Sequence, residues 1–197
     1  MSKNIIIQQG SDYVQEVRWE TTPIIYKAIT NISNVAPVAI QAVAHGLPDG
    51  WRAAITSVKG MDEINAINTP PKERDFHYIT KVDVDNITIN DINAASFGLY
   101  LSGGYLQYNT PVDLTGYTAR MTIKDRVGGV VLATLTDANG KIVLDNVAHV
   151  VKIKLGAVET ASYVWTRGVY DLELVSATGV VTSLLQGSVT LLREVTT

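Results

Sequence analysis

Apolar and polar side chains alternate along much of this chain. In residues 117–124, Tyr117, Ala119, Met121 and Ile123 alternate with polar residues. Similar runs occur at residues 13–20, 149–155 and 170–176. A period of two is typical of a β-strand with one buried and one solvent-exposed face. The pattern therefore predicts a chain built mainly of strands.

Turn residues separate these runs about every ten residues, which favours an all-β fold. Asp137-Ala138-Asn139-Gly140 lies between two apolar runs, and Asn-Gly supplies the positive φ angles of a tight hairpin turn. Gly103-Gly104 and Gly128-Gly129 are also expected to be hairpin turns, because neither pair has the spacing of a phosphate-binding loop. Helical spacing occurs at residues 157–164, which predicts a short helix between two strands.

Residues 24–109 differ in composition from the rest and are rich in Asn, Ala and Ile. Short strands are expected within residues 37–44, 52–58, 77–83 and 85–91. Pro70 and Pro71 precede four charged residues, 72–75. Proline cannot donate to a strand ladder and charges favour water, so this segment is predicted to be an exposed loop.

The overall composition is that of a globular protein. Of the 197 residues, 46% are hydrophobic and 18% charged, and the net charge is -3. No apolar run approaches the roughly 18 residues of a membrane span, and the N-terminal apolar patch is too short for a signal-peptide core. The net charge argues against a nucleic-acid surface. The absence of cysteine excludes disulfides, thiolate metal sites and cysteine nucleophiles.

Histidines and carboxylates are the first candidates for chemistry. His45, His77 and His149 lack metal-site spacing, and His45 is expected to bond the backbone of its own loop. A glycosidase needs two carboxyl groups about 5–10 Å apart in a cleft. Residues 171 and 173 (Asp, Glu) and residues 83 and 85 (both Asp) are interpreted instead as a solvated strand face and as turn residues.

Aromatic side chains are the second candidates. Four of them in the central region could form a sugar-stacking platform: Trp51, Tyr100, Tyr105 and Tyr108. The favoured interpretation is that they fill the thin core of a small β domain. Trp19 and Trp165 are interpreted as core or subunit-contact residues.

Four segments of the C-terminal half share a resemblance: PVDLTGYTAR (111–120), DANG (137–140), YDLEL (170–174) and LQGSV (185–189). On these segments the chain resembles the N-terminal domains of bacteriophage baseplate upper proteins and related tail proteins. In that family, a Gln-Gly pair and a strand ending in Trp precede the PVDLTGY-like motif. Residues 9–19 match this feature, but they lie about ninety residues upstream.

The intervening region has a resemblance of its own, at residues 45–50, 60–65 and 100–104. There it is similar to a small β module that recurs in phage proteins and is named after a half-domain of ubiquitin-activating enzymes. Between residues 65 and 78 the chain departs from that pattern with its charged proline loop. Ubiquitin chemistry is not implied, because the chain has no cysteine. A compact domain tolerates the insertion of a second domain between two of its strands.

The predicted fold is all-β. A discontinuous β-sandwich is expected from residues 1–23 and 110–197, with an inserted small β-barrel-like domain at residues 24–109. The strand within residues 13–20 is the predicted partner of the strand that starts at residue 117.

The resemblances imply a non-enzymatic phage virion structural protein of the tail, baseplate or neck, assembled in the bacterial host cytoplasm. It would dock on the tail core through edge strands and loops of the discontinuous domain, and connect or anchor fibres or receptor-binding proteins. Expected partners are other phage virion proteins (tail, baseplate or fibre) and further copies of the chain in a homo-oligomer, without nucleic acid or membrane insertion. No catalytic, cofactor-binding or metal-ligating residue and no cofactor is assigned. The alternatives are a capsid decoration protein and a host-receptor or carbohydrate-binding tail protein.

Overall fold

Two compact units make up the chain in the computed structural model, which describes residues 3–195. Unit 1 joins the N-terminal residues up to Trp19 to the C-terminal residues from Asp113, and unit 2 comprises Glu20–Val112. Strands account for 50% of the residues and helix for 6%, which confirms the all-β prediction. Within the described residues, no helix has the length and apolar character needed to cross a membrane.

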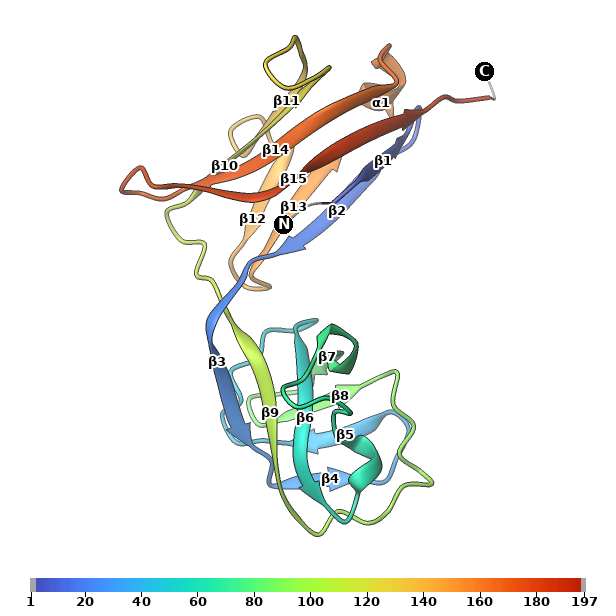
Figure 1. Cartoon of the computed structure of the whole chain (residues 1–197), viewed down its shortest axis with the longest axis vertical. Helices are drawn as coiled ribbons and strands as arrows, with labels where there is room; N and C mark the ends of the chain where they lie inside the picture. The colour runs from blue at the N-terminus through green and yellow to red at the C-terminus, as the bar shows by residue number, and fades with distance from the viewer. Residues whose placement is uncertain (1–2, 196–197) are drawn as a thin grey trace. The chain divides into compact units, whose positions relative to one another are not determined.

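Unit 1 has a β-sandwich-like architecture (Figure 1). Its larger sheet has five strands in the order β1-β15-β14-β10-β11, and its smaller sheet has the order β12-β13-β2. β1 runs parallel to β15, whereas the other neighbours are antiparallel. The strands are β1 (Ile5–Gln8), β2 (Tyr13–Arg18), β10 (Thr118–Lys124), β11 (Val131–Thr136), β12 (Ile142–Asp145), β13 (Val150–Leu155), β14 (Arg167–Val175) and β15 (Val181–Leu192).

The core of unit 1 follows the alternation of the sequence. On β10, Ala119, Met121 and Ile123 are buried while Arg120 is exposed. β13 and β14 bury their alternate apolar residues in the same way. The predicted short helix is confirmed as α1 (Ala157–Ser162).

Two predicted neighbour relations in unit 1 are wrong. β2 pairs with β13, in a register that places Val17 opposite Val151, and not with β10, which lies between β14 and β11. The segment 137–140 is not a hairpin turn, because β11 and β12 belong to different sheets and the segment crosses between them. The hairpin turn at Gly128-Gly129 is confirmed between β10 and β11.

Unit 2 is one curled sheet with the strand order β3-β9-β6-β7-β8-β5-β4 (Figure 1). The predicted short strands are confirmed. The hydrophobic core of unit 2 contains Trp51 and many isoleucines. β3 and β4 are the two ends of the strand order, so closure into a barrel is not confirmed. The elements are β3 (Glu20–Ala28), β4 (Asn31–Ser33), β5 (Val38–Gln41), β6 (Arg52–Lys59), β7 (His77–Lys81), β8 (Asn86–Ile89), β9 (Ser102–Pro111) and the 3₁₀ turns η1 (Asp62–Ile64) and η2 (Glu73–Asp75).

Gly103 and Gly104 lie inside β9 and do not form the hairpin turn predicted for them. Both have positive φ, and the regular pairing with β6 is interrupted beside them. A Cβ atom on Gly104 would lie 2.5 Å from Val58 Cγ2, closer than side chains pack. Glycine is therefore required at residue 104 by both conformation and space.

β3 and β9 carry the chain into and out of unit 2 as ladder partners. Glu20 lies opposite Pro111, and Thr21 lies opposite Thr110. Because this ladder starts at Glu20 and ends at Pro111, the unit boundaries lie outside the predicted positions 23/24 and 109/110. Arg52 fixes the start of β3 with two bonds to the Glu20 carboxylate, of 2.7 and 2.8 Å.

Candidate functional site

β1 leaves an open edge at one end of the five-stranded sheet of unit 1. Lys3 and Gln9 donate their backbone N–H groups to β15. Since backbone groups alternate in direction along a strand, Ile6 turns its N–H and C=O away from β15. The Ile6 side chain is 62% exposed. This edge therefore offers both hydrogen-bonding groups and an apolar contact to an added strand.

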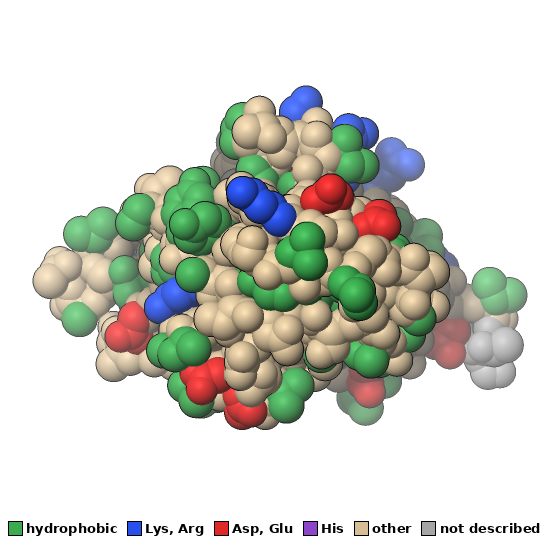
Figure 2. All heavy atoms as spheres, turned by 90° about the horizontal axis from the view of Figure 1, so that it is seen from below, with side chains coloured by type: hydrophobic (Ala, Val, Ile, Leu, Met, Phe, Trp, Pro, Cys, Tyr) green, Lys and Arg blue, Asp and Glu red, His purple; other side chains and the backbone are tan. Residues whose placement is uncertain are grey.

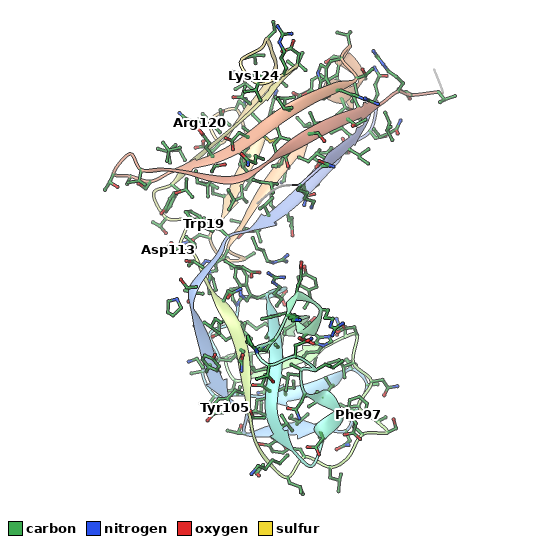
Figure 3. The ribbon with its side chains drawn as sticks, viewed as in Figure 1. Trp19, Phe97, Tyr105, Asp113, Arg120 and Lys124 are labelled. Carbon is green, nitrogen blue, oxygen red and sulfur yellow. The ribbon has the colours of Figure 1, made fainter. Side chains whose placement is uncertain are left out.

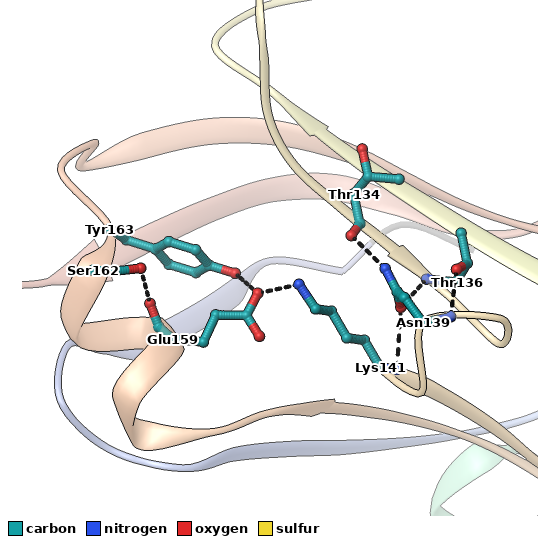
Figure 4. Close-up of polar contacts among 7 residues, drawn as sticks. All are labelled: Thr134, Thr136, Asn139, Lys141, Glu159, Ser162 and Tyr163. Atoms are coloured by element: carbon teal, nitrogen blue, oxygen red, sulfur yellow. Dashed lines mark hydrogen bonds and ion pairs between the residues drawn. The ribbon is translucent and has the colours of Figure 1, made fainter.

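The opposite edge of the same sheet, β11, is closed by a side chain. Asn139 Nδ2 donates to the Thr134 carbonyl at 3.1 Å, and Asn139 Oδ1 accepts the Thr136 N–H at 2.9 Å (Figure 4). Asp137 donates its backbone N–H to the Ala119 carbonyl, toward β10. Because backbone groups alternate in direction along a strand, the N–H and C=O groups of Thr134 and Thr136 point away from β10. The Asn139 amide thus occupies hydrogen bonds that an added strand would use.

Glu159 ties α1 to the crossover between β11 and β12. Its Oε1 accepts a bond from Lys141 Nζ at 2.5 Å and one from the Tyr163 hydroxyl at 2.7 Å (Figure 4). Burial, and then the bond to the Glu159 carboxylate, raises the pKa of Tyr163 above its ordinary value of 10.0. The tyrosine therefore remains a neutral hydrogen-bond donor, and the cluster braces the fold.

A polar groove of about 410 Å³ lies on the outer face of the five-stranded sheet, where Arg120 and Lys124 project from β10 (Figure 3). Arg120 Nε lies 2.6 Å from Glu173 Oε2, and Asp171 accepts a 2.7 Å bond from Ser183. Both carboxylates considered as a glycosidase pair thus have structural partners. This supports their interpretation as a solvated strand face.

Asp83 and Asp85, the other carboxylate pair, stabilise a turn. Asp83 Oδ1 accepts the backbone N–H groups of Asp85 and Asn86, both at 2.8 Å. The Asn86 side chain is the main cause that lowers the pKa of Asp83. Asp85 in turn accepts the N–H of Ala44. Among residues 3–195, no group of three His, Asp or Glu side chains could hold a metal ion.

The histidines occupy structural positions. His45 is fully buried; Leu47 donates its N–H to Nδ1 at 3.0 Å, and Nε2 donates to the Asp83 carbonyl at 3.0 Å. Burial lowers the pKa of His45, so the ring is neutral with its proton on Nε2. The prediction that His45 bonds its loop backbone is confirmed. His77 starts β7 and His149 precedes β13, both half-buried.

The charged proline loop differs from its prediction at one residue. Asp75 is only 5% exposed, because it accepts bonds from the Lys72 N–H at 2.7 Å and from Asn68 Nδ2 at 2.8 Å. The Lys72 N–H is the main cause that lowers the pKa of Asp75. The expectation that all four charges are solvated is therefore wrong for Asp75, whose carboxylate organises the loop from within.

The PVDLTGY motif is an anchored turn. Asp113 Oδ1 accepts the Thr115 N–H at 2.9 Å, and Asn146 Nδ2 donates to the Thr115 hydroxyl at 2.9 Å. At the end of the motif, the Tyr117 ring meets the Trp19 ring edge-on, with centroids 5.5 Å apart. The motif therefore positions the entry into β10, and its residues have a structural role.

A second groove, the neutral groove, has a volume of about 480 Å³ and lies in unit 2 on the sheet face opposite the core. On adjacent strands, Tyr26 lies opposite Gln107, and Thr56 lies opposite Tyr105. Every lining residue is uncharged. These residues are Tyr26, Thr56, Ser57, Asn65, Ala66, Thr69, Pro70, Pro71 and Gln107.

The aromatic candidates divide between the core and this face. Trp51 and Tyr108 are buried, which confirms the core-filling interpretation, and Tyr100 is half-buried. Tyr105 is 45% exposed instead, and its ring lies 6.4 Å from that of Tyr26 at an interplanar angle of 81°. Tyr26 was missed at the sequence level because no strand was expected at residues 24–28.

Exposed apolar side chains do not gather into one large patch on the face shown in Figure 2. Hydrophobic groups there are interspersed with polar atoms and with both acidic and basic side chains. Scattered apolar residues of this kind are normal on protein surfaces. The strand edges and the two grooves are therefore the more informative features.

No protein-family model matches this chain, and no curated protein matches it either.

Proposed function

We propose that the chain is a non-enzymatic bacteriophage virion protein of the tail, baseplate or neck. It docks on another virion component through unit 1 and connects or anchors fibres or receptor-binding proteins. The segments that resemble phage tail proteins support the virion assignment. The observation that carries the docking mechanism is the difference between the two edges of the five-stranded sheet. The Asn139 side chain occupies backbone hydrogen bonds of β11, whereas the edge of β1 is open beside the exposed Ile6.

Docking would use strand addition to β1. A partner strand gains main-chain hydrogen bonds from an open edge, and alternate side chains supply specificity. Virion symmetry would repeat the contact and produce a homo-oligomeric ring or cluster. The carboxylates and the imidazole discussed above are engaged in turns and strand contacts, which supports a role without catalysis.

Purified virions of the phage that encodes the chain provide the test. Ile6→Glu places a charge at the open edge and should deplete the protein from particles, as measured by quantitative mass spectrometry. Val14→Glu is the matched control, because Val14 on β2 is 61% exposed and Ile6 is 62% exposed. Absence of the unmodified protein from particles would refute the virion assignment. Equal incorporation of the two variants would refute docking through β1.

Electron microscopy with a label on the incorporated protein separates tail from head positions. Label on the tail, baseplate or neck is the expected result. Label distributed over the capsid shell would favour the decoration alternative and contradict the proposal.

A further inference from the structure

The neutral groove contains hydrogen-bonding groups with unused capacity. Gln107 Nε2 donates to Thr56 Oγ1 at 2.7 Å, which leaves Gln107 Oε1 and the Thr56 hydroxyl proton available. Within the described part of the chain, the hydroxyl groups of Tyr26, Ser57 and Thr69 have no hydrogen-bond partner. Donors and acceptors therefore converge on the groove from three strands, β3, β6 and β9, and from the proline loop.

An exposed aromatic surface accompanies these polar groups. Tyr26 is 56% exposed, and the Tyr105 ring meets the Tyr26 ring edge to face. Pro70 and Pro71 add apolar surface on another side of the groove. Small-molecule sites combine apolar surface with a few placed polar groups in this way, and about 480 Å³ is within their usual size range.

The lining also limits the charge of a ligand. A charged group that enters a groove without a counter-charge loses hydration and gains no ion pair. The polar groove of unit 1 differs, because its Arg120 and Glu173 are paired with each other. The neutral groove therefore favours an uncharged ligand that is rich in hydrogen-bonding groups and has an apolar face.

We infer that the neutral groove binds a neutral saccharide. The C–H face of a sugar ring packs on the Tyr26 ring, while sugar hydroxyls bond to the Gln107 amide and the neighbouring hydroxyl groups. A proline-rich peptide fits less well, since such peptides dock between aromatic ridges and Tyr105 stands at 81° to Tyr26. This binding activity goes beyond virion docking and does not depend on it.

The test uses the full chain on an array of neutral oligosaccharides built from hexoses, deoxyhexoses and N-acetylhexosamines, with acidic saccharides beside them. Saccharides that bind are then titrated against variants by calorimetry. Tyr26→Ala and Gln107→Ala should each weaken binding by about tenfold or more. Tyr78→Ala is the matched control, because Tyr78 is 62% exposed in unit 2 but does not line the groove. Circular dichroism verifies that each variant is folded.

Binding of a neutral saccharide that is lost in the two groove variants and kept in the control supports the inference. The inference is overturned if no neutral saccharide binds, if both groove variants bind normally, or if acidic saccharides bind more tightly. Binding of a proline-rich decapeptide in place of saccharides overturns it in favour of a peptide site. Tyr26→Ala should leave incorporation into virions unchanged, so failure of this inference and failure of the docking proposal are distinguishable.

Discussion

Replacement of His45 by alanine should strongly destabilise unit 2. The buried imidazole is the partner of two backbone groups, the Leu47 N–H and the Asp83 carbonyl. An unpaired buried polar group costs about 1–3 kcal/mol, so two of them cost about 2–6 kcal/mol before any cavity is counted. A domain is typically stable by about 5–15 kcal/mol, so the loss is a large fraction of the total.

Tryptophan fluorescence can follow unit 2 separately. Trp19 and Trp165 belong to unit 1, so a Trp19→Phe, Trp165→Phe background leaves Trp51 as the single indole. Trp51 is fully buried in the core of unit 2, and its emission reports unfolding of that unit in urea. The asparagine of His45→Asn keeps an acceptor near the position of Nδ1 but cannot reach the Asp83 carbonyl. This variant should therefore lower the free energy of unfolding by about half as much as His45→Ala. A His45→Ala variant within about 0.5 kcal/mol of the background would refute the argument.

The same imidazole makes the stability of unit 2 depend on pH. Burial lowers the native pKa of His45 from its ordinary 6.5, so the unfolded state takes up the proton first as the pH falls. The contribution of the neutral ring is complete above pH 6.5 and decreases as the pH falls from there to the native pKa. The free-energy gap between the background and His45→Asn should therefore narrow from about pH 7.5 to about pH 5. A constant or widening gap would contradict this sign.

Three further perturbations test other parts of the structure. Asn139→Ala should open the β11 edge and cause self-association that increases with concentration in sedimentation velocity; a strictly monomeric variant would contradict the edge-closing role. Glu20→Gln should lower the free energy of unfolding of unit 2 by about 1–3 kcal/mol in the fluorescence assay, because Arg52 loses a charged two-bond partner that is 10% exposed. Glu73→Gln is its control, since Glu73 is 94% exposed and lies 4.0 Å from Arg52, and it should change stability by less than about 0.5 kcal/mol. Replacement of residues 20–112 by a short Gly-Ser linker should leave unit 1 folded, with dispersed NMR signals and cooperative thermal unfolding; an unfolded product would show that unit 1 needs the insertion.

Alternation in the sequence predicted the faces of strands better than their neighbours. It correctly assigned the buried face of β10, because the polarity of each side chain indicates directly whether that side chain is buried. It could not choose between β2 and β14 as the partner of β10, since both strands are amphipathic and pairing is decided by the assembled sandwich. The Asn-Gly pair had the same limit: it indicated a change of direction at residues 139–140 but not which sheet the chain enters next.

The neutral groove was only partly accessible from the sequence. Tyr105 and Tyr108 were grouped together, although residues an odd number apart on a regular strand point to opposite faces. That rule alone could have separated the exposed Tyr105 from the buried Tyr108. Tyr26 follows a strand segment that contains Pro23, and its place beside Gln107 results from pairing across about eighty residues of sequence. No local pattern contains that information.

The pairing of β3 with β9 has a consequence for how this chain can change. Glu20 and Pro111 are ladder partners, and opposite residues in an antiparallel ladder have Cα atoms about 4.5–5.5 Å apart. The chain therefore leaves unit 1 for unit 2 and returns to it at two points that lie close together. Any domain whose own termini lie that close can be transplanted into the same position without stretching the host strands. Residues 20–112 therefore meet the geometric requirement for replacement by another domain with closely spaced termini.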